Sequence, residues 1–241
     1  MIRIWIIFLL CIASQAQTNA QVIISLIFGD ELNSDKLLFG LHLNYTGSHL
    51  TNLEGAENLG GVKVALLFNY RLNNRFNLQS ELVPPMAFGT KGLTPYSLGD
   101  AGLDSLFQNG EVERRVWLTG ITALGQYRVW DYIRVEGGPE IFLRFKAKDK
   151  FLAEPEAGDL SLERNIKDQT STFEVGLALG ASYQLGKGTG MMFGIRYYWG
   201  LTDVMKNDAG NQQFRMWQIT SGIPIGRKKM EKEKAPPPSG G

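Results

Sequence analysis

The chain has 241 residues, 25 of them Lys or Arg and 24 Asp or Glu, and its formal net charge is +1 at pH 7. A balance so close to neutral provides neither the basic field that nucleic acid requires nor an acidic excess for a cationic substrate, so no nucleic-acid partner is expected. The length suits a single large all-β domain, and 28 glycines suit many strands joined by tight turns.

The first predicted element is a secretory signal peptide over residues 1–20. A positively charged start precedes an apolar run over residues 4–13, and small residues follow it up to Ala20. Lipidation of the single cysteine, Cys11, is disfavoured because Leu10 stands where a lipoprotein signal has a small residue. Without the signal the mature chain has no cysteine, so neither a disulfide nor a thiolate metal site is expected.

Residues 21–36 (QVIISLIFGDELNSDK) are predicted to form an N-terminal periplasmic segment. Their apolar start fits a short strand, a helix or a segment under a barrel mouth. No later run of about eighteen apolar residues occurs, which argues against a helical membrane protein. An exported chain of this kind is either soluble outside the cytoplasm or a β-barrel in an outer membrane.

The next part, residues 37–226, alternates between apolar and polar residues. The stretch over 62–82, VKVALLFNYRLNNRFNLQSEL, reads as a hairpin because a strand places successive side chains on opposite faces. Eight such segments occur, over residues 37–46, 61–71, 76–88, 112–129, 132–147, 172–185, 191–202 and 214–225.

The connections between these segments alternate in length. They are tight after the second, fourth and sixth segments and longer after the others, notably over 89–111 and 148–171. Bacterial outer-membrane barrels have an even number of strands, short periplasmic turns and longer external loops. The sequence therefore predicts an all-β fold, an eight-stranded antiparallel up-and-down transmembrane barrel in the bacterial outer membrane.

Aromatic residues mark both ends of the apolar face. When the strands are laid antiparallel, one group falls near the long loops and the other near the short turns, with mainly Leu, Val, Ile and Ala between them. The belt at the long loops is Tyr45, Trp117, Tyr197, Trp199 and Trp217, and the belt at the short turns is Tyr70, Tyr127 and Tyr183. Two aromatic belts around an aliphatic band indicate a face that contacts outer-membrane lipid.

The opposite face is rich in Gly, Ala and Ser and carries charges of both signs. A soluble lipocalin-like barrel would expose this face to water and would need long charged side chains throughout it. We expect instead a narrow lumen in which the charged residues neutralise one another: Lys63, Glu81, Arg134, Glu136, Glu140, Arg144, Glu174 and Arg196. An eight-stranded bore is only wide enough for side chains, so an open pore is not expected.

Four motifs occur in order along most of the mature chain: ISLIFGDELNS after the signal, NLQSEL, VEGGPEIFL and RYYWGLTDV. With them the chain resembles the PorT-like outer-membrane β-barrel family of Bacteroidetes. The resemblance implies an eight-stranded barrel of mostly unassigned function, with one relative tied to protein secretion. One departure from a regular ladder is Pro84 with Pro85, which predicts a bulge and a third strand that flares from the barrel at its upper end.

No catalytic pattern, cofactor motif or metal-ligand spacing is found, so the protein is not expected to be an enzyme or to need a cofactor or metal. His42 is expected in the lumen as a hydrogen-bonded packing residue. Glu136 and Glu140 share a face, but Arg134 and Arg144 share it too and would keep both carboxylates ionised.

The last element, residues 227–241, combines mixed charge with Pro and Gly and is predicted to be a disordered periplasmic tail, with a contact arm as the alternative. Two functions stay open. One is a structural or interaction role in the cell envelope with possible envelope or secretion protein partners. The other is a narrow transport or small-ligand-binding barrel.

Overall fold

The computed structural model describes residues 34, 36–153, 159–185, 190–206 and 210–225. The predicted signal peptide and tail, and nearly all of the predicted N-terminal segment, lie outside these residues. The strands within the described part are β1 Leu37–Leu50, β2 Glu57–Arg71, β3 Phe76–Leu93, β4 Glu111–Arg128, β5 Ile133–Ala153, β6 Leu160–Asn165, β7 Phe173–Gln184, β8 Met192–Gly200 and β9 Phe214–Pro224. The described helices are α2 Ala101–Phe107 and the 3-10 helix η2 Lys167–Gln169.

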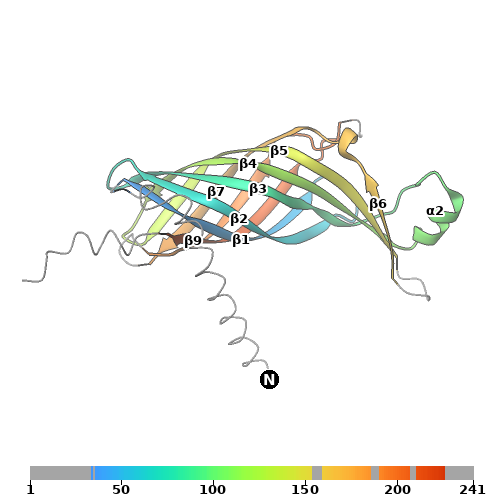
Figure 1. Ribbon diagram of the computed structural model, residues 1–241, viewed down its shortest axis with the longest axis horizontal. Helices are drawn as coiled ribbons and strands as arrows, with labels where there is room; N and C mark the ends of the chain where they lie inside the picture. Colours follow the sequence, from blue (N-terminus) through green and yellow to red (C-terminus); the bar gives the residue numbers. More distant parts are fainter. Residues whose placement is uncertain (1–33, 35, 154–158, 186–189, 207–209, 226–241) are drawn as a thin grey trace, which may run out of the picture.

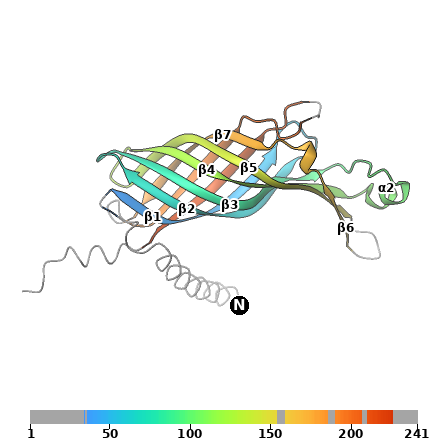
Figure 2. The ribbon, with the colours of Figure 1, turned by 45° about the horizontal axis from the view of Figure 1, so that its top comes forward.

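The strands form a closed barrel (Figures 1 and 2). Their order is β4-β3-β2-β1-β9-β8-β7-β5, and an additional pairing of β4 with β5 closes the ring. All of these pairs are antiparallel, and β6 pairs only with the outer end of β5. Eight strands therefore make the wall, which confirms the predicted fold class.

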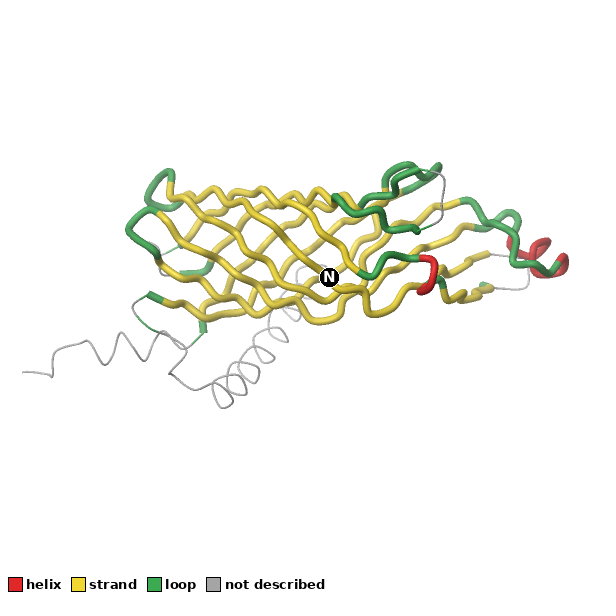
Figure 3. The backbone as a smooth tube through the Cα atoms, turned by 90° about the horizontal axis from the view of Figure 1, so that it is seen from above, coloured by secondary structure: helices red, strands yellow, loops and turns green. Residues whose placement is uncertain are grey.

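Short and long connections lie at opposite ends of the barrel. Figure 3 shows small green turns at one end, whereas the loops with the red helices gather at the other. The turn between β2 and β3 is held by Asn73, whose side-chain oxygen accepts the N–H groups of Arg75 and Phe76 at 2.8 and 2.9 Å. This Asx turn explains why a pair of asparagines lies between the two strands.

The long-connection end has more structure than the sequence indicated. β3 and β5 continue past their predicted ends, and α2 and β6 lie in stretches expected to be loops. This region, which we call the rim extension, comprises α2, β6 and the ends of β3, β4 and β5 at the long connections. Its own apolar core consists of Leu93, Phe107, Val112 and Phe151. The alternation of KAKDKF over 146–151 was present in the sequence, but its outward positions are lysines, so it lacked the apolar face that identifies a membrane strand.

Topology can be tested with introduced cysteines and a membrane-impermeant thiol reagent. We expect Ser105→Cys, in α2, to label on intact cells, and Asn74→Cys, in the β2–β3 turn, to label only after the envelope is opened, because the long connections of such barrels face outward. If only Asn74→Cys were labelled on intact cells, the barrel would have the opposite orientation in the membrane.

Candidate functional site

A buried charge cluster crosses the middle of the barrel, with Arg196 of β8 at its centre. The Arg196 guanidinium lies 2.7 Å from a carboxylate oxygen of Glu81 and 2.7 Å from one of Glu136. A third carboxylate, that of Glu140, lies 3.6 Å away. The strands bring these groups together because each residue occupies an inward position of the two-residue repeat.

A lysine and a histidine complete the cluster on the Glu81 side. Lys63 Nζ lies 3.2 Å from Glu81 Oε2, and His42 Nδ1 lies 2.8 Å from Glu81 Oε1. The three carboxylates of Glu81, Glu136 and Glu140 thus face Lys63, Arg196 and the His42 imidazole. His42, expected in the lumen as a hydrogen-bonded packing residue, is buried there against Glu81. We call this group of residues the lumen charge cluster.

Three of the predicted network residues lie elsewhere in the lumen. Arg144 donates to the backbone carbonyls of Ser171 and Lys167 at 2.9 and 2.5 Å and so holds the loop that leads into β7. Glu174 accepts a hydrogen bond of 2.8 Å from the Tyr198 hydroxyl. Arg134 is paired in register with Arg128 rather than with a carboxylate.

Amide side chains extend the lumen charge cluster toward the short turns. Gln126 Nε2 donates to Gln79 Oε1 at 2.6 Å and to Glu136 Oε2 at 2.8 Å. Asn69 Nδ2 donates to Gln126 Oε1 at 2.7 Å. This row of hydrogen-bonded amides was not predicted from the sequence, because only the charged residues of the inward face were considered there. The available signal was the presence of inward amides on neighbouring strands.

Toward the long connections the lumen is filled by apolar side chains. The Phe142 ring lies 6.3 Å from the Phe88 ring and 6.0 Å from the Tyr198 ring, measured between centroids. The buried cluster around them includes Val83, Leu118, Phe214 and Met216 and reaches Ile166 and Val204 in the long connections. Ionic and apolar layers together fill the bore over the described residues.

The predicted belt residues all belong to the outer surface, with their side chains partly or largely exposed. At the long-connection end the Tyr45 and Trp217 rings are 5.6 Å apart and the Tyr197 and Trp199 rings 4.5 Å apart. At the other end Tyr127 contacts Phe76 and Tyr183 contacts Tyr132. The rings flank a band of exposed aliphatic side chains such as Leu179 and Ile195.

The wall is interrupted between β2 and β3. Pairs run from Arg71↔Asn77 to Leu66↔Leu82 and resume at Asn58↔Thr90, so each strand spans the gap with the same number of residues. Pro84 and Pro85, which have no N–H to donate, lie in this gap, where β3 also shifts register against β4. The predicted bulge is present, whereas the predicted flare is wrong, because pairing resumes above it.

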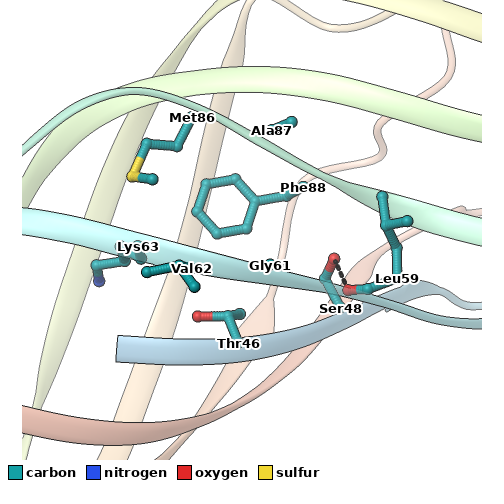
Figure 4. A pocket seen from close by; sticks show the side chains of 9 residues that line it. All are labelled: Thr46, Ser48, Leu59, Gly61, Val62, Lys63, Met86, Ala87 and Phe88. Atoms are coloured by element: carbon teal, nitrogen blue, oxygen red, sulfur yellow. Dashed lines mark hydrogen bonds between the residues drawn. The ribbon is translucent and has the colours of Figure 1, made fainter. Parts of the chain in front are cut away.

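Side chains partly replace the missing ladder of this gap, which we call the wall slit (Figure 4). The Ser48 hydroxyl accepts the Gly89 N–H and donates to the Gly89 carbonyl, both at 2.9 Å. The Val64 N–H lies 3.2 Å from the sulfur of Met86. A small pocket lies at the slit, lined by Thr46, Ser48, Leu59, Gly61, Val62, Lys63, Met86, Ala87 and Phe88.

The described residues offer no other kind of site of two common types. That part of the chain contains no cluster of three or more His, Cys, Asp or Glu that could hold a metal ion. It also contains no helix that is both long and apolar enough to cross a membrane.

The closed eight-stranded wall, with an apolar outer band between aromatic rings, defines the protein as an outer-membrane β-barrel. A family model described as outer membrane protein beta-barrel domain matches residues 15–206. The chain belongs to this family and is located in the outer membrane. No curated protein matches the sequence.

Several solved structures are similar to this chain at low sequence identity. The attachment invasion locus protein Ail of Yersinia pestis is 12% identical, with 80% of this chain and 100% of that chain covered and a TM-score of 0.42. Neisserial surface protein A is 11% identical, with 79% and 96% covered and a TM-score of 0.40. OprG of Pseudomonas aeruginosa is 10% identical, with 78% and 91% covered and a TM-score of 0.32.

Proposed function

We propose that the protein is a closed envelope barrel that works through its external surface, in a structural or interaction role, and is neither an open channel nor an enzyme. The observation that carries this proposal is the filled lumen. The lumen charge cluster blocks the middle of the bore, and the apolar layer from Phe88 to Tyr198 blocks the end with the long connections.

The rim extension supports an external role because it is held in a defined position. Arg114 donates two hydrogen bonds to the Asp149 carboxylate, at 2.9 and 2.8 Å, and a third to Gln212 Oε1 at 3.1 Å. The Tyr96 hydroxyl donates to the same carboxylate at 2.9 Å. Burial and the Asp149 carboxylate raise the pKa of the Tyr96 phenol, so this donor stays protonated. An ordered surface of this kind suits protein contact, because little ordering entropy is lost on binding.

A link to secretion, as in the PorT-like resemblance, is one form that such contacts would take. It rests on the four sequence motifs alone. The external surface is where a partner of that kind would bind, and the exposed α2 residues Ser105 and Leu106 are the positions at which a crosslinker would report it.

The experiment that tests the proposal is conductance in planar bilayers. We expect reconstituted protein to give no large, steady channel conductance, because charged and aromatic side chains fill an eight-stranded bore. An open porin inserted into the same bilayers serves as the positive control. Steady conductance by the folded protein would refute the closed lumen and favour a transport role.

A second candidate function, binding of a small ligand, is favoured by the wall slit. Thr46 Oγ1, at the pocket, is buried without a hydrogen-bond partner among the described residues. The same holds for Oδ1 and Nδ2 of Asn44, which is paired in register with Lys63 of the pocket lining. Such groups are normally satisfied by a buried water or a ligand. A Met86→Ala variant that widens the slit would be expected to bind a small polar dye faster than the parent, measured by fluorescence; an unchanged rate would count against this candidate.

A further inference from the structure

The outward side chains of β4 and β5 change character at Trp117. Toward the barrel middle they are apolar and exposed, as at Ile121 and Ile141, which face each other across the two strands. Away from the middle, cross-strand pairs are Trp117↔Lys146, Arg115↔Lys148 and Glu113↔Lys150. The outer face therefore turns from apolar to cationic within one residue pair. We call Arg115, Lys146, Lys148 and Lys150 the cationic surface.

The cationic surface contains a like-charge pair, since Arg115 and Lys148 lie directly opposite each other. Like charges at such positions destabilise a sheet unless counter-charges compensate them. Glu113 Oε2 lies 2.7 Å from Arg115 Nη2, and Glu163 of β6 pairs with Lys148. Within the described part of the chain, Glu113 and Glu163 contact two of these four cations, and Glu111 lies next along the same face of β4, so a net positive charge remains.

Lys146 fixes the depth of this charge in the membrane. Its ammonium nitrogen lies 4.5 Å from the centroid of the Trp117 ring, within the range of a cation–π contact. Trp117 belongs to the aromatic belt at the long-connection end, and belt rings sit at the level of lipid headgroups. The cationic surface therefore begins at headgroup level and continues outward along β5.

We propose that the cationic surface binds the phosphate of a lipid in the leaflet at the long-connection end. Lys146 and Lys148 supply charged donors for the phosphate oxygens. Arg115, whose Nε and Nη2 contact Glu113, adds the charge of its guanidinium beside them. A lipid fits better than a free anion, because exposed apolar side chains lie directly below on the same strands, among them Phe145 at 62% exposure and Leu143 at 44%. The phosphate of a lipid would contact the cationic surface, and its acyl chains would contact the exposed apolar side chains nearer the barrel middle.

The test uses purified, delipidated protein in detergent and short-chain phosphatidic acid as the probe, with retained lipid measured by native mass spectrometry. We expect the double variant Lys146→Gln, Lys148→Gln to bind the probe about tenfold more weakly, because each lysine loses a charge-assisted contact. Lys206→Gln, which removes an exposed lysine in the β8–β9 connection, is the matched control and should bind like the parent. Lys146→Arg with Lys148→Arg should restore binding.

Three results would overturn the proposal. Equal binding by the parent and the double variant would show that the lysines do not hold the phosphate. Equal retention of a diacylglycerol with the same chains would show that the acyl chains alone are bound. Full displacement of the probe by equimolar inorganic phosphate would show a site for a soluble anion. Folding of every variant is checked by the shift in gel mobility on heating.

Discussion

Arg196→Met is expected to lower the free energy of unfolding by about 3 to 5 kcal/mol, because removal of one partner leaves buried carboxylates without compensation. The Arg196 side chain is fully buried and contacts Glu81 and Glu136 at 2.7 Å each. Methionine occupies a similar space without charge, so the loss reports the electrostatic contribution more than a cavity. The measurement is a urea titration of the barrel folded in detergent micelles.

Two further variants separate this effect from a general loss of packing. Arg75→Met removes an exposed arginine in the β2–β3 turn and should change stability by less than about 0.5 kcal/mol. Adding Glu136→Gln to Arg196→Met should recover part of the loss, because one unpaired carboxylate disappears with it. A double variant no more stable than Arg196→Met would show that the ion pairs are not the cause.

Leu179→Arg, in the middle of β7, is expected to cost about 2 to 4 kcal/mol, because an arginine on the lipid face near the bilayer midplane must leave water. Leu179 points outward and is 58% exposed. The matched control is Leu106→Arg in α2, where the leucine is 51% exposed but lies in the rim extension. Folding efficiency into vesicles, read by the heat-dependent gel shift, measures both.

The comparison between the two leucines is what makes the experiment specific. Similar exposure of the two leucines with an unequal cost of the two arginines is expected only when one residue faces lipid and the other faces water. Similar losses in both variants would mean that arginine is tolerated or rejected for local reasons, and the assignment of the outer face would then be wrong.

The barrel itself was readable from the sequence because its rules are local. Two-residue alternation identified each wall strand, and alternate short and long connections fixed the antiparallel order and the end at which the loops gather. Tyr70 and Tyr183, for example, are predicted to lie on the outer face, and the structure exposes both. Where a tight turn such as that at Asn73 follows a strand, the predicted and observed ends of the strand differ by only a few residues.

The grouping of the lumen charges was not readable in the same way. Alternation says that Arg134 and Arg196 both point inward, but their partners depend on the stagger between strands around the ring. That stagger places Arg196 among three carboxylates and Arg134 opposite Arg128. The inward rings of Phe142 and Tyr198 were also not predicted. A single apolar residue on the otherwise polar face of a strand does not by itself indicate an apolar layer in the lumen.

The wall slit interrupts the hydrogen-bond ladder through which a force would pass from β3 to β2. Above Leu82, β3 is joined by a ladder to β4 but not to β2 until Thr90. A pull on the rim extension therefore passes through β3, β4 and β5 as one sheet and meets little resistance at β2 over this interval. Because ladder pairs close the gap at both ends, β2 and β3 keep the same register on either side of it.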